Sequence, residues 1–182
     1  VDIGGGTTEI AVMSLGGVVF SKSLRVAGDA MDGAIINYMR KKFNLLIGES
    51  TAEKIKKEIG TAIPTTNNVF LMKGRDIRTG TPKEISLTEE DACEALMPIL
   101  SQMLAAIKEA LESTPPELSA DLVDMGLVLT GGGALLKNID KLISKDTGLP
   151  VTIADNPLEC VAIGTGKALE NEELFSTMLS EY

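Results

Sequence analysis

Histidine and tryptophan are absent from the 182-residue chain, and aromatic side chains make up only 3% of it. Without histidine, neither a Ser-His-Asp triad nor a histidine general base can be assembled. The two cysteines, Cys93 and Cys160, lack the Cys-x-x-Cys spacing of zinc ligands, so a zinc site is not indicated. We expect both cysteines to be buried free thiols, within a core built from aliphatic side chains.

Basic charge is also scarce, because 26 acidic residues outnumber 17 lysines and arginines and the formal net charge is −9. Nucleic-acid binders gain much of their affinity from basic side chains that contact phosphates, so we expect no nucleic-acid partner. The same acidity disfavours direct contact of this chain with an anionic membrane surface. No stretch approaches the roughly 18 apolar residues of a membrane-spanning helix, and we expect no signal peptide.

Strand and helix patterns alternate along the chain, which predicts an α/β fold. Residues 27–86 look like a small α+β subdomain inserted between the two halves, 1–26 and 87–182, of one inner α/β subdomain. The expected elements of the first half are a β-hairpin over 1–26 with its turn at 16–17, helices over 29–43 and 50–60, and strands over 67–72 and 82–87. A long helix over 88–113 should begin at a cap formed by Thr88 and Asp91, and Pro98 should kink or divide it. A buried strand over 126–130, a helix over 134–146, a strand over 150–153 and a helix over 158–169 should follow.

Two glycine triplets carry the main functional signal. The first triplet (Gly4, Gly5 and Gly6) follows Asp2 and precedes Thr7 and Thr8. The second triplet (Gly131, Gly132 and Gly133) is expected after a buried strand and at the start of a helix. Glycine inside regular structure costs roughly 0.5–1 kcal/mol relative to alanine, so a ligand that touches bare backbone, such as a nucleotide phosphate, would explain both.

Simpler explanations exist for each triplet. The first can be a tight turn beside a surface aspartate, and the second can serve close packing of a helix on a strand. Neither triplet has the residues of a P-loop or the order of a dinucleotide fingerprint. Their joint presence favours a nucleotide, and the Asp2 carboxylate at a strand end could then hold hydrated magnesium or orient an attacking water.

Several stretches resemble one superfamily. Residues 1–12 resemble the second phosphate motif of the actin-fold ATPases, whose lobes have a ribonuclease H-like mixed sheet flanked by helices, and residues 129–136 resemble their adenosine motif. Residues 153–168 resemble the second helix that connects the lobes. Within that superfamily the chain is most similar to the MreB family of bacterial actin-like cell-shape proteins, which includes Mbl, through the runs RVAGD at 25–29, TAEKIK at 51–56, TPPEL at 114–118 and AIGTGK at 162–167.

The resemblance implies ATP and magnesium as cofactors and assigns roles to site residues. Asp2 would hold magnesium through water and position the attacking water. The phosphate-binding positions would be Gly4, Gly5, Gly6, Thr7 and Thr8, the adenine and ribose side would be Glu53 and Lys56, and the adenosine cradle would be Gly131, Gly132, Gly133, Ala134 and Leu135. Glu53 has a second explanation, because Ser50 and Glu53 fit a helix capping box.

The resemblance also implies that this chain is the second lobe of a longer protein, whose first lobe would precede Val1 and carry the membrane-attaching segment. The intact protein would be a slow cytoplasmic ATPase that forms filaments on the inner face of the cell membrane, and it would work with cell-shape and wall-synthesis proteins to maintain rod shape. This lobe alone should bind nucleotide weakly and hydrolyse little. The alternatives are a sugar kinase or chaperone-like ATPase of the same fold, and a scaffold whose glycines are purely structural.

Overall fold

The structure, a computed structural model, describes residues 1–170. The strands are β1 (Asp2–Ile3), β2 (Thr8–Ser14), β3 (Gly17–Leu24), β4 (Leu45–Leu46), β5 (Val69–Asp76), β6 (Pro82–Thr88), β7 (Leu127–Leu129) and β8 (Val151–Ile153). The helices are α1 (Gly28–Phe43), α2 (Glu49–Glu58), α3 (Glu89–Glu112), α4 (Pro116–Met125), the short 3-10 helix η1 (Gly132–Leu135), α5 (Ile139–Thr147) and α6 (Cys160–Glu170). Their alternation confirms the expected α/β class.

Five strands form a mixed array at one end of the molecule. Strands β1, β2 and β3 are antiparallel in that order, and β7 pairs with β8 in parallel. The two groups join where the Ile3 amide donates to the Thr130 carbonyl and the Thr130 amide donates to the Val1 carbonyl, both at 2.9 Å, in a parallel bridge. The carboxyl ends of β1 and β7 therefore lie side by side, and each is followed by one of the glycine triplets.

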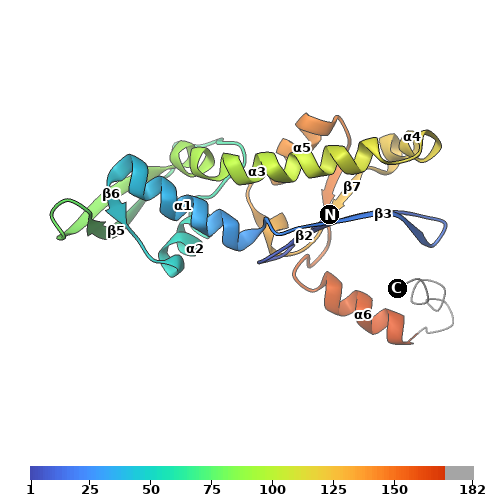
Figure 1. The fold of residues 1–182 in the computed structure, drawn as a ribbon, viewed down its shortest axis with the longest axis horizontal. Helices are drawn as coiled ribbons and strands as arrows, with labels where there is room; N and C mark the ends of the chain where they lie inside the picture. The colour runs from blue at the N-terminus through green and yellow to red at the C-terminus, as the bar shows by residue number, and fades with distance from the viewer. Residues whose placement is uncertain (171–182) are drawn as a thin grey trace.

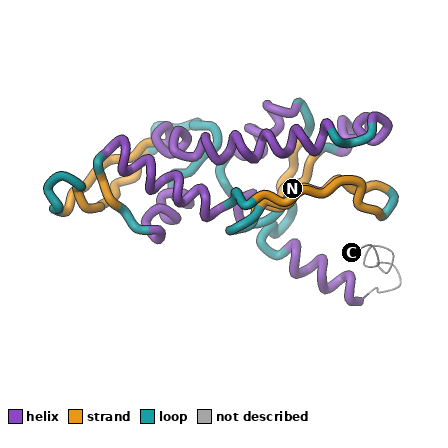
Figure 2. Tube along the Cα trace, viewed as in Figure 1, coloured by secondary structure: helices purple, strands orange, loops and turns teal. Residues whose placement is uncertain are grey.

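The antiparallel sheet β4-β5-β6 occupies the opposite end of an elongated molecule (Figure 1). Helices α1 and α3 run side by side between the two ends, as Figure 2 also shows. Their inward faces are fully buried, with Met31, Ile35 and Met39 on α1 and Leu96 and Leu100 on α3. The proposed subdomain boundaries at residues 27 and 86 stay a prediction, although β4, β5 and β6 do lie together.

Helix α3 begins as the sequence predicts and then departs from the prediction. A capping box joins Thr88 and Asp91 at its start, because each side chain accepts from the other residue's backbone amide. Pro98 was expected to kink or divide this region; it does not divide it, because one helix runs from Glu89 to Glu112, and the kink stays a prediction. Leu96 and Leu100, on either side of Pro98, are both buried in the core, and their packing offsets the hydrogen bond that proline cannot donate.

The segment after the second triplet differs from the expected helix over 134–146. The triplet opens the short helix η1, and α5 begins only at Ile139. Between them Asn138 takes a left-handed conformation with φ of 60°, which ends one helical segment before the next starts. Its side-chain amide donates to the Thr61 hydroxyl at 3.1 Å and to the Ile63 carbonyl at 2.9 Å, so a contact distant in sequence sets this break.

Two local predictions are wrong. The expected capping box at Ser50 is not formed, since Gly48 is the residue before α2 and makes no side-chain cap. Glu53 instead forms an ion pair with Lys57 at 2.7 Å, one turn further along the helix. Cys93 is buried as expected, whereas Cys160 is only half-buried.

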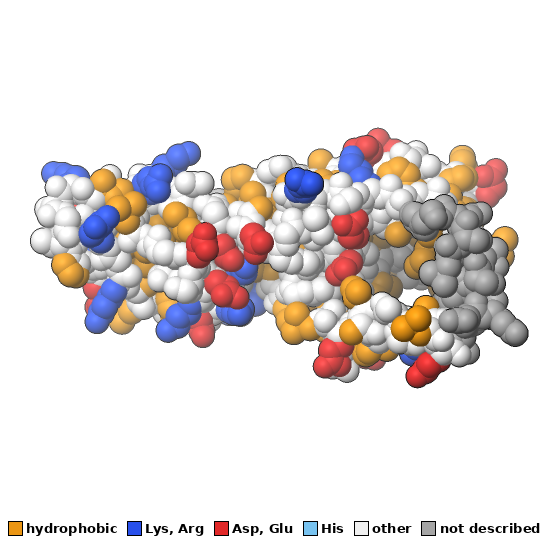
Figure 3. Space-filling model, turned by 60° about the horizontal axis from the view of Figure 1, so that its bottom comes forward, with side chains coloured by type: hydrophobic (Ala, Val, Ile, Leu, Met, Phe, Trp, Pro, Cys, Tyr) orange, Lys and Arg blue, Asp and Glu red, His pale blue; other side chains and the backbone are white. Residues whose placement is uncertain are grey.

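Helix α6 projects away from the rest of the described chain (Figure 1). Several of its apolar side chains and that of the preceding Leu158 are exposed, with Leu158 at 70%, Val161 at 63% and Leu169 at 69%. Figure 3 shows apolar side chains on the surface of the part of the molecule that carries α6. Among the described residues, no helix has both the length and the apolar character needed to cross a membrane.

Candidate nucleotide site

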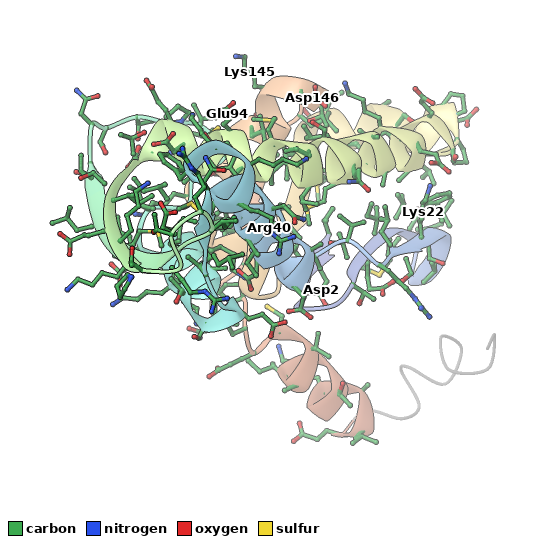
Figure 4. The ribbon with its side chains drawn as sticks, turned by 60° about the vertical axis from the view of Figure 1, so that its left-hand side comes forward. Asp2, Lys22, Arg40, Glu94, Lys145 and Asp146 are labelled. Atoms are coloured by element: carbon green, nitrogen blue, oxygen red, sulfur yellow. The ribbon has the colours of Figure 1, made fainter. Side chains whose placement is uncertain are left out.

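A cavity of about 930 Å³ lies where the two glycine triplets meet. Its wall includes Asp2, Gly4 and Gly5 from the first segment and Gly131, Gly132, Gly133 and Leu135 from the second. Helices α1 and α2 supply further wall residues, among them Glu53 and Lys56. In Figure 4, Asp2 lies near the start of α1 and above the segment that leads to α6. The structure thus brings together nine of the residues that the sequence singled out.

The first triplet is held as a tight turn against the start of α1. The Gly4 amide donates to the Thr7 carbonyl at 2.9 Å and closes the turn. The amides of Gly28 and Asp29 donate to the carbonyls of Gly4 and Gly5 at 3.1 and 2.8 Å. These bonds occupy carbonyl groups of the turn, and they place the amino-terminal end of α1, which favours anions, at the cavity.

The second triplet packs tightly on β1, so the close-packing explanation holds for two of its glycines. Gly131 has φ of +79°, and a Cβ there would lie 2.4 Å from both Asp2 Oδ1 and the Ile3 carbonyl oxygen. At Gly133 a Cβ would lie 2.1 Å from Ile3 Cγ2. Both positions therefore need glycine for packing, and the bare backbone that results also lines the cavity.

Four of the predicted site residues lie outside the cavity wall. Thr8 is fully buried in β2, where its hydroxyl donates to the Val26 carbonyl at 2.7 Å. Ala134 is likewise fully buried. Gly6 and Thr7 are exposed and are not among the residues that line the cavity. The predicted roles of these four residues in nucleotide binding stay predictions.

The wall formed by α1 and α2 is ionic. Lys57 holds the pKa of Glu53 below its usual range through a hydrogen bond and their opposite charges. Lys56 Nζ lies 2.8 Å from Asp32 Oδ2 and 3.0 Å from the Gly28 carbonyl oxygen. Burial raises the pKa of Asp32, and the hydrogen bond and charge of Lys56 oppose that rise.

Acidic groups outnumber basic groups on the cavity wall. Five carboxylates and three lysine ammonium groups line it, namely Asp2, Asp29, Asp32, Glu49, Glu53, Lys56, Lys57 and Lys137. The part of the chain that the structure describes has no cluster of three or more acidic, cysteine or histidine side chains suited to a metal ion. Such a wall suits a metal that arrives with its ligand better than a metal held by protein groups alone.

Part of the cavity wall is apolar. Pro157, Leu158 and Val161, from the segment that leads into α6, line it together with Leu135. Leu135 is 56% exposed and Leu158 is 70% exposed, so both offer apolar surface to a planar ligand. The cavity wall therefore combines bare backbone and charged side chains with apolar side chains, which suits a nucleotide.

The family profile described as MreB/Mbl protein matches residues 1–177. The chain belongs to the MreB/Mbl family. It is 52% identical over 171 residues to the cell shape-determining protein MreB of Escherichia coli K12, which covers 93% of this chain and 49% of that protein. It is 47% identical over 172 residues to Mbl of Bacillus subtilis, which covers 94% of this chain and 52% of Mbl. The chain thus spans about half the length of the curated relatives it matches.

Solved structures confirm the fold of this MreB/Mbl chain. MreB5 of Spiroplasma citri bound to AMPPNP matches with a TM-score of 0.91 and 40% identity over 94% of this chain and 52% of that one. A MamK double helical filament matches with a TM-score of 0.68 and 26% identity over 86% of this chain and 49% of that one. The chain therefore has the fold of an actin-like ATPase lobe, as the sequence predicted.

Sequence reasoning on this MreB/Mbl chain missed a group of cavity residues contributed by distant segments. They are Gly28, Asp29, Met31, Asp32, Glu49, Ser50, Lys57, Gly60, Leu136, Lys137, Pro157, Leu158 and Val161. One signal was available, because Asp29 and Asp32 lie one turn apart at the start of an expected helix. Nothing local in the sequence shows that Lys137 or Leu158 would line the same cavity as residues of α1 and α2.

Proposed function

We propose that the chain is the nucleotide-binding second lobe of a bacterial actin-like cell-shape protein, and that its cavity binds ATP or ADP. One observation carries the proposal: both glycine triplets open into a single cavity. The relative MreB5 of Spiroplasma citri, solved with AMPPNP and also with ADP, has the same lobe at TM-scores of 0.91 and 0.90.

The phosphates belong at the first triplet. Among the described residues, the amides of Gly5 and Gly6 have no acceptor, so they can donate to phosphate oxygens. The start of α1 adds its dipole at the same point. The adenosine belongs at the second triplet and the apolar wall, with Leu135 and Leu158 against the base and Lys56 and Glu53 toward the sugar.

Magnesium fits this site as a companion of the nucleotide. A triphosphate that approaches a predominantly acidic wall is repelled unless a divalent cation offsets its charge. Asp2 lies at the end of β1, beside the first triplet, where its carboxylate could hold a hydrated magnesium ion through water. Magnesium, when bound, would supply the charge that stabilises phosphoryl transfer.

The intact protein, with a further lobe closing over the nucleotide, would be a slow ATPase that assembles into filaments beneath the cell membrane and acts with wall-synthesis proteins in rod-shape maintenance. The relatives named as cell shape-determining proteins support this part of the proposal. The MamK double helical filament, built on the same lobe fold, supports self-association. This chain by itself should bind nucleotide weakly and turn it over little.

The test is calorimetric titration of ATP, with and without magnesium. We expect saturable binding that magnesium strengthens and that Asp2→Ala weakens by at least about tenfold in the presence of magnesium, since one lost charged contact costs about 1.5–3 kcal/mol. Asp124→Ala, an exposed acidic residue on α4, is the matched control and should bind normally. Absence of binding by the wild-type protein would contradict the proposal.

Sedimentation addresses the filament part separately. The intact protein should pellet with ATP and magnesium, whereas a sugar kinase of the same fold would instead release ADP when a sugar is added and would form no polymer. Sugar-dependent ADP release without sedimentable material would overturn the cytoskeletal proposal and leave nucleotide binding intact.

A further inference from the structure

Asp32 lies on the cavity wall, yet it belongs to neither glycine motif. It projects from α1 with its side chain 15% exposed, and its Oδ2 accepts a hydrogen bond from Lys56 Nζ at 2.8 Å. Its other oxygen, Oδ1, is buried and has no hydrogen-bond partner among the described residues. Within the described chain, this half-buried carboxylate therefore depends on a single cationic partner, which comes from a different helix.

Lys56 is held at two points. Its ammonium donates to Asp32 on α1 and to the carbonyl oxygen of Gly28, at 3.0 Å. A lysine ammonium has three N–H donors. Two are used by the protein, so one remains for a ligand in the cavity that Lys56 lines.

The place where Lys56 is held adjoins the first triplet. A Cβ at Gly28 would lie 3.5 Å from Lys56 Nζ and 3.3 Å from the Gly4 carbonyl oxygen. The Gly28 amide also donates to that carbonyl at 3.1 Å. The ammonium therefore lies close to the turn expected to hold phosphates. Because a lysine side chain is long and flexible, this position depends on the groups that hold it.

We propose that Asp32 is a positioning residue for nucleotide binding, which fixes the Lys56 ammonium so that its remaining N–H reaches the bound nucleotide. The proposal rests on the proposed nucleotide-binding function and deepens it. Asp32 itself does not touch the nucleotide. Its carboxylate fixes the position of the Lys56 ammonium and links α1 to α2 at the cavity wall.

A double-mutant cycle on magnesium-ATP affinity tests the proposal. The measurements use the full-length protein that contains this 182-residue chain. Asp32→Ala should weaken binding on the order of tenfold, the effect seen when the partner that orients a metal ligand is removed. Lys56→Ala should weaken binding at least as much. The double variant should bind no more weakly than Lys56→Ala alone, because Asp32 acts only through Lys56.

Two matched controls lie on α2, the helix that carries Lys56. Lys54→Ala and Glu58→Gln change exposed side chains of α2 that are not on the cavity wall, and both should bind as the wild type does. Thermal unfolding of each variant checks that it folds. If Asp32→Ala does not fold, Asp32→Asn keeps the size of the side chain and takes its place in the cycle.

Two results would overturn the proposal. One is wild-type affinity in a folded Asp32 variant. The other is a loss in the double variant equal to the product of the two single losses, which would mean that Asp32 and Lys56 act independently. Failure of the proposed function looks different, since the wild-type protein and every control would then show no saturable binding.

Discussion

At the scale of single residues, the second triplet combines three glycines with different requirements. Gly131 and Gly133 leave no room for a methyl group against Asp2 and Ile3. Gly132 is exposed, and the nearest atom to an added Cβ is Leu158 Cδ2 at 3.1 Å, the end of an exposed side chain. Packing therefore requires glycine at positions 131 and 133 but not at position 132.

This difference predicts opposite outcomes for two alanine substitutions. Gly133→Ala should lower the free energy of unfolding by about 1–3 kcal/mol, because the methyl group overlaps Ile3 and the turn must shift. Gly132→Ala should leave stability unchanged or raise it by up to about 1 kcal/mol, because alanine restricts the unfolded chain. Urea unfolding of the two variants checks this, and equal stabilities would contradict it.

At the scale of elements, the loop between α2 and β5 is fastened at both ends by polar contacts. Asn138 holds its first part through Thr61 and Ile63. Glu89, 3% exposed at the start of α3, holds its second part. The Glu89 carboxylate accepts hydrogen bonds from the Thr65 and Thr66 amides at 3.0 Å and from the Thr66 hydroxyl at 2.6 Å. These bonds hold the pKa of Glu89 below its ordinary value of 4.5.

The lowered pKa of Glu89 predicts a pH-dependent stability. A carboxyl whose pKa is lower in the folded state stabilises fully above its ordinary value, and that contribution is lost as the pH falls through the folded pKa. Glu89→Gln should therefore lower the free energy of unfolding by about 2 kcal/mol at pH 7. The difference from the wild type should shrink below about pH 4.5. Urea unfolding across this range measures it, and a difference that stays constant in acid would contradict the assignment.

The same elements show what the sequence could predict. The cap formed by Thr88 and Asp91 was predicted because both partners lie within one turn. The start of α5 was predicted wrongly because the Asn138 side chain donates a hydrogen bond to Thr61, which lies 77 residues away in the sequence. The pairing of Asp32 with Lys56 was missed for the same reason, since it joins residues 24 apart on two helices. Both glycine triplets were found because close contact with the backbone requires glycine, and the glycines stand at the site itself in the sequence.

At the scale of the whole molecule, charge is distributed unevenly along the long axis. Residues 27–86 contain 10 of the 17 basic residues and only 7 of the 26 acidic ones. In Figure 3, lysine and arginine side chains are frequent over the end that carries β5 and β6, while acidic side chains also extend to the opposite end. In a head-to-tail polymer unlike surfaces meet at each contact, so this distribution would favour association.

Salt should therefore weaken the proposed assembly of the intact protein. Between about 0.1 M and about 1 M salt, the Debye length falls from about 10 Å to about 3 Å. The sedimentable fraction with ATP and magnesium should fall over that range, and the charge reversal Lys73→Glu, at an exposed position of β5, should lower it already in dilute salt. A pelleted fraction that is constant or rises with salt would show that apolar contacts dominate.

The interlock of the second triplet with β1 has a consequence for protein engineering. Gly131 and Gly133 fit closely against Asp2 and Ile3. These two short segments therefore pack as one unit, although Ile3 and Thr130 are 127 positions apart in the sequence. A chimaera that takes either segment from a distant relative should pack poorly where β1 meets the second triplet, unless the other segment is exchanged with it. Chimaeras between members of this family should therefore exchange the two segments together.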